Sequence, residues 1–297
     1  IMQDFGATNE KSLTLRTHCQ TSGVSLTEKD PYNNIVRTSY EALSAVLGGT
    51  QSLHTNSFDE AIALPTEFSS RIARNTQLIL QNETGVTNTV DPLAGSYFVE
   101  KLTEDICSAA WKIIEEVEEL GGMTKAVAAG MPKLSIEESA TKKQAKIDSG
   151  KQVVVGVNKF KNPKEPKIDV LVIDNEKVRE DQITKISTLK KDRDDKILKG
   201  HLNKITEAAK DNTGNLLALS IEAMRARGTV GEVSKALEDA FGRHYATNVG
   251  VSGVYGKFFE KDEKFMDIQN KINIFEKEKG RRPRVLIVKM GQDGHDR

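Results

Sequence analysis

The feature that most constrains this chain is the alternation of strand-like and helix-like segments in its first 130 residues. The stretch "SLTLRTHC" (12–19) alternates as a strand does, and "TQSLHTNS" (50–57) is a second short strand that enters a loop. Residues 35–49 and 66–85 carry apolar side chains at helical spacing and end at glycines. Strand, helix, strand, helix predicts a parallel sheet with crossover helices, and polar residues just after the strands favour a (β/α) barrel.

The remainder of the chain is predicted to be mostly helical. Its elements are a strand–turn–strand over 87–103, an amphipathic helix over 105–122, a polar helix over 135–150, two strands within 151–174, and charged helices over about 175–237. Within the last of these, Thr229 and Glu232 have the spacing of a capping box. The pattern therefore predicts an α/β part followed by a long, largely helical part.

Composition excludes several classes of partner. The 43 Lys and Arg residues balance the 43 Asp and Glu residues, which argues against a nucleic-acid-binding protein. No apolar run approaches the ~20 residues of a membrane-spanning helix. The two cysteines, Cys19 and Cys107, lie far apart and indicate no disulfide framework. We expect a cytoplasmic protein in a reducing compartment, with no nucleic-acid or membrane partner.

Polar side chains gather near both predicted strands. They are His18 and Gln20 at the first strand and Gln51, His54, Asn56 and Glu60 around the second. This is the edge of a parallel sheet where a hydroxyl-rich ligand would bind. For Glu60 there is a structural alternative, because Ser57 and Glu60 have capping-box spacing and Glu60 would then bond to the start of its own helix.

The last residues combine a predicted buried strand (284–290) with a polar loop that contains Asp293 and His295. A histidine in such a loop can ligate a metal, and a nearby carboxylate can orient its ring. The alternative is a solvated terminal histidine. Because the chain begins at Ile1 and stops in this loop, we expect an interior piece of a longer polypeptide.

Several long stretches, in order, resemble one enzyme family. They are "RTHCQTSGVSLTEKDPYNNIVRT", "GGTQSLHTNSFDEAIALPTEFSSRIARNTQ", "VDPLAGSYFVEKLT", "GGMTKAVAAGMPKLSIEESA" and "GRRPRVLIVKMGQDGHDR". The resemblance is to the adenosylcobalamin-dependent acyl-coenzyme A mutases, of the methylmalonyl-coenzyme A mutase type, and it is weakest over about 175–215. It implies the C-terminal part of a (β/α)8 (TIM) barrel at 1–130, a mostly helical linker with a strand pair at 131–283, and the first strand of a Rossmann-like cobalamin-binding domain at 284–297.

The resemblance also implies roles for individual residues. Lys11, His18 and Gln51 match positions that line the coenzyme A and substrate channel. Positions around the adenosyl ribose match Gln20, Asn56 and Glu60, and positions that touch the corrin ring match Gly23, Glu60 and Ala63. In the terminal loop, His295 matches the axial ligand to cobalt, Asp293 the residue hydrogen-bonded behind it, and Lys289 a lysine near that pair. The family's substrate-clamping Tyr, Arg and His precede the matched region.

The implied activity is the interconversion of methylmalonyl-coenzyme A and succinyl-coenzyme A by radical chemistry, with an acyl-coenzyme A substrate. A second mutase subunit or a second copy of the chain is the implied protein partner, and the mitochondrial matrix the implied location in a eukaryote. The chain departs from many methylmalonyl enzymes at Val24, Leu93 and Ala94, which leaves an isobutyryl-type mutase open. A cobalamin-carrying module for methyl transfer and a barrel enzyme without cobalamin are also compatible with the sequence. We expect this piece to be inactive alone.

Overall fold

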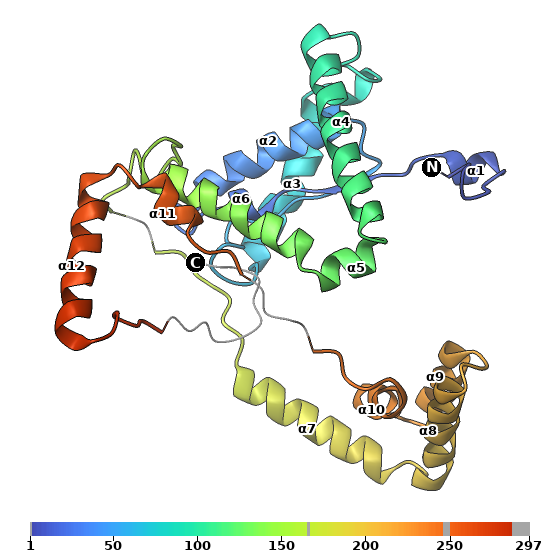
Figure 1. The fold of residues 1–297 in the computed structure, drawn as a ribbon. Helices are drawn as coiled ribbons and strands as arrows, with labels where there is room; N and C mark the ends of the chain where they lie inside the picture. The colour runs from blue at the N-terminus through green and yellow to red at the C-terminus, as the bar shows by residue number, and fades with distance from the viewer. Residues whose placement is uncertain (1, 165–166, 246–249, 287–297) are drawn as a thin grey trace. The chain divides into compact units, whose positions relative to one another are not determined.

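The computed structural model describes residues 2–164, 167–245 and 250–286. These residues form two compact units, one containing the described residues up to 171 and from 250 onward, the other those between 172 and 245 (Figure 1). The fold is mostly helical α/β with a small parallel sheet.

The sheet of the first unit is a β–α–β element. Strand β1 (His18–Gln20) pairs in parallel with β2 (Ser52–His54), with His18 opposite Ser52, and the crossover is α2 (Asn33–Leu47). The predicted strand 12–19 is wrong over most of its length, because α1 (Glu10–Leu13) occupies its start. The Asn9 side chain accepts from the backbone N–H of Lys11 at 2.9 Å and so favours a helical turn there.

Helix α3 (Glu67–Glu83) lies beside α2 in the first unit (Figure 1). It begins with a capping box in which Thr66 and Ser69 each bond to the backbone of the other. Gly85, at φ 71°, takes the left-handed conformation that ends the helix, and the short 3₁₀ helix η2 (Val86–Asn88) follows.

Helix α4 (Tyr97–Glu119) corrects the strand–turn–strand prediction for 87–103. Asp91 and Gly95 have positive φ and form a turn, and the backbone N–H of Gly95 donates to the Glu100 carboxylate at 3.1 Å. This contact across the helix start favours helix where apolar content alone suggested a strand. Much of the apolar side of α4 is exposed, including Tyr97, Phe98, Leu102, Ile106, Trp111, Ile113 and Ile114.

The first unit continues with α5 (Met123–Ala128) and α6 (Met131–Asp148), and later with α11 (Val254–Phe258) and α12 (Glu263–Lys279). Helix α11 packs against α6, and the Tyr255 hydroxyl donates to Asp148 at 2.7 Å. The two strands predicted within 151–174 appear, in the described ranges, only as the isolated bridges Val155–Lys159 and Leu64–Leu171. Of the predicted terminal strand, residues 284–286 are not in a strand and 287–290 lie outside the described residues.

The second unit is helical and has its own core. It comprises α7 (Asn175–Lys191), α8 (Asp195–Lys210), α9 (Leu216–Arg225) and α10 (Val230–Phe241). The core consists of Leu198, Ile205, Ala223 and Ala236. The predicted capping box of Thr229 and Glu232 is confirmed at the start of α10.

Candidate functional site

The polar loops after β1 and β2 meet at the carboxyl edge of the parallel pair. The backbone N–H of Thr21 donates to the carbonyl of His54 at 3.0 Å, which continues the strand pairing by one residue. The Thr21 hydroxyl accepts from the backbone N–H of Asn56 at 2.9 Å and donates to the Asn56 side-chain oxygen at 3.2 Å. Thr21 therefore fixes the position of Asn56 at this edge.

Four of the sequence-predicted cofactor residues come together here. The Gln20 amide donates to the Asn56 side-chain oxygen at 3.3 Å. Gly23, in the 3₁₀ helix η1 (Gly23–Ser25), lies so close that a Cβ on it would be 3.3 Å from Asn56 Nδ2 and 3.5 Å from Glu60 Oε1. Gly23, Asn56 and Glu60 thus lie close together, and a residue without a side chain at position 23 permits this approach.

Asn56 has an unused hydrogen-bond donor at this edge. Its side chain is 2% exposed, and Nδ2 has no hydrogen-bond partner within the described part of the chain. A buried amide donor without a partner costs about 1–3 kcal/mol. Such groups are rare in folded proteins, so an acceptor on a ligand or on a bound water is needed to satisfy this one.

The capping-box alternative for Glu60 is wrong. The backbone N–H of Glu60 donates to the carbonyl of Ser57 at 3.2 Å within a turn, and α3 begins only at Glu67 with Thr66 as its cap. The Glu60 carboxylate forms no hydrogen bond or ion pair with any residue that the structure describes, so it is available as an acceptor.

Asp59 is a second buried carboxylate in this loop that sequence reasoning missed. It is 1% exposed, Oδ2 accepts from the backbone N–H of Thr66 at 3.4 Å, and Oδ1 has no partner among residues 2–164, 167–245 and 250–286. Its backbone carbonyl accepts from the N–H of Ala63 at 3.0 Å, which places the predicted corrin contact Ala63 in the same turn. The sequence alone does not show which of the two neighbouring carboxylates, Asp59 or Glu60, is buried.

Of the predicted substrate residues, His18 and Gln51 lie at the strand starts of the β–α–β element and Lys11 lies on α1. His18 begins β1, and its Nδ1 is 2.7 Å from the Ser52 hydroxyl. The Gln51 side chain accepts from the backbone N–H of Thr17 and donates to the carbonyl of Gly49 at 3.1 Å, so it braces the strand starts. Lys11 is exposed on α1, and no contact within the described residues joins its side chain to His18 or Gln51.

The predicted metal-binding loop, with Lys289, Asp293 and His295, lies outside the described residues. In the ranges that are described, no three or more His, Cys, Asp or Glu side chains form a group that could hold a metal ion. Nor does any helix in these ranges combine the length and the apolar character that crossing a membrane requires.

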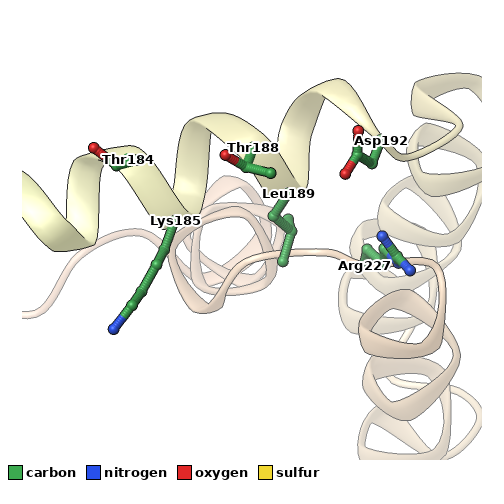
Figure 2. Close-up of a pocket in the computed structure, with 6 residues that line it drawn as sticks. All are labelled: Thr184, Lys185, Thr188, Leu189, Asp192 and Arg227. Atoms are coloured by element: carbon green, nitrogen blue, oxygen red, sulfur yellow. The ribbon is translucent and has the colours of Figure 1, made fainter.

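The second unit contains a hollow of about 400 Å³ that none of the predicted site residues lines. Figure 2 shows that its polar groups do not converge, since Thr184 and Thr188 point to one side of α7 and Lys185 to the other. Arg227, in the turn after α9, lies at one end with Asp192. We therefore place the candidate site at the edge of β1 and β2.

The chain is similar to known proteins over its full length. The family model described as methylmalonyl-CoA mutase matches residues 1–243. The chain is 60% identical over its full length to methylmalonyl-CoA mutase of Cereibacter sphaeroides, of which it covers 42%. It is 56% identical to the Rhizobium meliloti enzyme, again covering 42%, and 55% identical to mitochondrial methylmalonyl-CoA mutase of Homo sapiens, covering 40%.

These matches show that the chain belongs to the methylmalonyl-CoA mutase family. It spans about two fifths of the length of these curated relatives.

Proposed function

We propose that a full-length protein carrying this sequence, at the length of its relatives, is an adenosylcobalamin-dependent isomerase that interconverts methylmalonyl-CoA and succinyl-CoA. The observation that carries this proposal is the unpartnered, buried amide of Asn56 beside Gly23 and Glu60 at the carboxyl edge of β1 and β2. Family membership over most of the chain supplies the reaction class.

The residues of this edge fit the nucleoside part of the proposed cofactor. A ribose hydroxyl both donates and accepts hydrogen bonds, and Asn56 Nδ2 offers a donor while Glu60 offers an acceptor. Gly23 keeps the approach to both residues free of a side chain, since even a Cβ there would contact Asn56 Nδ2 and Glu60 Oε1. Gln20, at the end of β1, and Ala63, in the loop after β2, would also contact the nucleoside.

Adenosylcobalamin supplies homolytic cobalt–carbon chemistry when it is bound. The contribution of this chain is to hold the nucleoside in one orientation and to keep water from it. Asn56 would donate to a ribose oxygen, Glu60 would accept from a ribose hydroxyl, and Thr21 holds Asn56 in place. His18, Gln51 and Lys11 are proposed to contact the acyl-CoA from the strand starts and α1.

The domain layout is part of the same proposal. The β–α–β element is the repeating unit of a (β/α)8 barrel, and the exposed apolar side of α4 is what further barrel elements would cover. Residues 131–283 are proposed as the linker and 284–297 as the start of the cobalamin-binding domain. There, His295 would ligate cobalt, with Asp293 and Lys289 nearby. A second mutase subunit or a second copy would complete the assembly.

The test is turnover by the full-length protein with adenosylcobalamin, comparing methylmalonyl-CoA with isobutyryl-CoA. Conversion of methylmalonyl-CoA to succinyl-CoA is expected. Conversion of the isobutyryl thioester alone would contradict the substrate assignment and would point to Val24, which is 77% exposed, and Leu93. Cobalamin binding without turnover of either thioester would favour a carrier module.

A further inference from the structure

Asn34 joins the two loops that carry the candidate site, although no proposed ligand contact involves it. Its side chain is fully buried, and Nδ2 donates to the carbonyls of Thr27 and Phe58, both at 2.8 Å. Oδ1 accepts from the backbone N–H of Thr27 at 3.1 Å. One amide on α2 therefore connects the loop that contains Gly23 to the loop that contains Asn56.

Arg37, one helical turn further along α2, holds Asn34 in this position. Nη1 donates to Asn34 Oδ1 at 2.7 Å and to the Thr27 hydroxyl at 2.9 Å. Nη2 reaches a distant part of the chain and donates to the carbonyl of Val155 at 2.8 Å. The planar, forked guanidinium can span these acceptors, whereas an ammonium is a point donor.

Residues 152–159 form a tight turn that presents the Val155 carbonyl. Asn158 braces the turn, because its Oδ1 accepts from Val154 N at 2.8 Å and its Nδ2 donates to the carbonyls of Ile147 and Gln152 at 2.8 and 2.7 Å. Gly156, at φ +84°, lies against the loop after β1, since a Cβ there would be 3.2 Å from the Asp30 Cβ. The turn therefore contacts that loop directly as well as through Arg37.

We propose that the turn 152–159 is a positioning element for the ligand loops, acting through Arg37 and Asn34. The inference rests on the proposed function in that the loops bind the nucleoside of the cofactor. A continuous chain of hydrogen bonds leads from the Val155 carbonyl through Arg37 and Asn34 to Thr27 and Phe58, and Asn158 fixes the neighbouring Val154 in the turn. A shift of the turn thus changes the spacing between the loops of Gly23 and Asn56 without replacing any residue proposed to contact the ligand.

The first test is hydrogen exchange on the full-length protein, which needs no cofactor. Asn158→Ala removes the three hydrogen bonds that brace the turn, and Arg37→Lys is the milder variant that keeps the positive charge but loses the forked guanidinium. Both are expected to raise exchange roughly 3- to 30-fold in peptides covering 21–30 and 55–64. Arg74→Lys, at an exposed position on α3, is the matched control and should change neither loop. Faster exchange confined to 152–159 would overturn the proposal.

The second test is a double-mutant cycle on adenosylcobalamin affinity. Each single variant should weaken binding by a similar roughly 3- to 30-fold factor. The double variant should bind adenosylcobalamin no more weakly than the weaker-binding of the two single variants, because both substitutions interrupt the same chain of hydrogen bonds. If the loss of affinity in the double variant equals the product of the two single losses, the two positions act independently and the proposal is overturned. If the wild-type protein binds no cobalamin, the proposed function fails, and exchange alone decides whether the turn positions the loops.

Discussion

Gly23→Ala tests the candidate site with the smallest change that the structure allows. Gly23 lies outside the left-handed region of φ, so alanine is compatible with its backbone, and the new methyl would lie 3.3 Å from Asn56 Nδ2 and 3.5 Å from Glu60 Oε1. Asn56 has to yield by a few tenths of an ångström. The fold should lose about 1 kcal/mol of stability, the low end of the cost of adding a methyl group to a packed site.

The effect on the ligand should be larger. The methyl covers the free donor of Asn56, so the ligand loses a hydrogen bond to a buried amide, which is worth about 1–3 kcal/mol. Cofactor affinity should fall roughly 5- to 150-fold. Calorimetric titration of the full-length protein with adenosylcobalamin measures this loss, and a thermal melt measures stability. Unchanged affinity in a folded variant would refute the claim that these residues bind the cofactor.

Three further predictions concern the second unit and are read from hydrogen exchange of amides in α8 and α10 of the full-length protein. Hydrogen bonds from Arg193 (2.6 and 2.7 Å) lower the pKa of Glu232 from 4.5 to about 2, so the stability from this pair is full above pH 4.5 and is lost as pH falls toward 2. Glu232→Gln should lower the stability of the unit by about 1–2 kcal/mol after allowance for solvent screening. An opening free energy of the wild-type α8 and α10 amides that does not change with pH would contradict this prediction. Gly200 lies in α8 with no heavy atom near its Cβ position, so Gly200→Ala should stabilise the helix by about 0.5–1 kcal/mol. Slower exchange of the α8 amides would support this prediction, and faster exchange would contradict it. Ile205→Ala removes a fully buried core side chain and should destabilise the unit by about 2–5 kcal/mol, whereas a loss below about 1 kcal/mol would contradict the core assignment.

Local chemistry predicts the helices well. The capping box of Thr229 and Glu232 is written in four consecutive residues, and the structure starts α10 there. The strand prediction for residues 97–103 is wrong because Tyr97, Phe98 and Val99 have strand-like composition. The turn at Gly95 and its bond to Glu100, which favour helix, depend on backbone geometry that composition does not show.

The site is partly predictable for a similar reason. Polar residues after strands, and family resemblance, indicate Gln20, Gly23, Asn56 and Glu60, which the structure brings together. Nothing in the sequence indicates Asn34, because its importance comes from burial between two loops and from Arg37, whose partner Val155 is 118 residues away. Only the tertiary fold brings such segments together, so no local pattern could mark them.

A structure of the full-length protein with adenosylcobalamin bound tests the central claim most directly. We predict that Asn56 Nδ2 lies about 3 Å from a ribose oxygen and that Glu60 accepts from a ribose hydroxyl. A structure in which Asn56 Nδ2 donates instead to a protein carbonyl, with the nucleoside bound elsewhere, would contradict that claim.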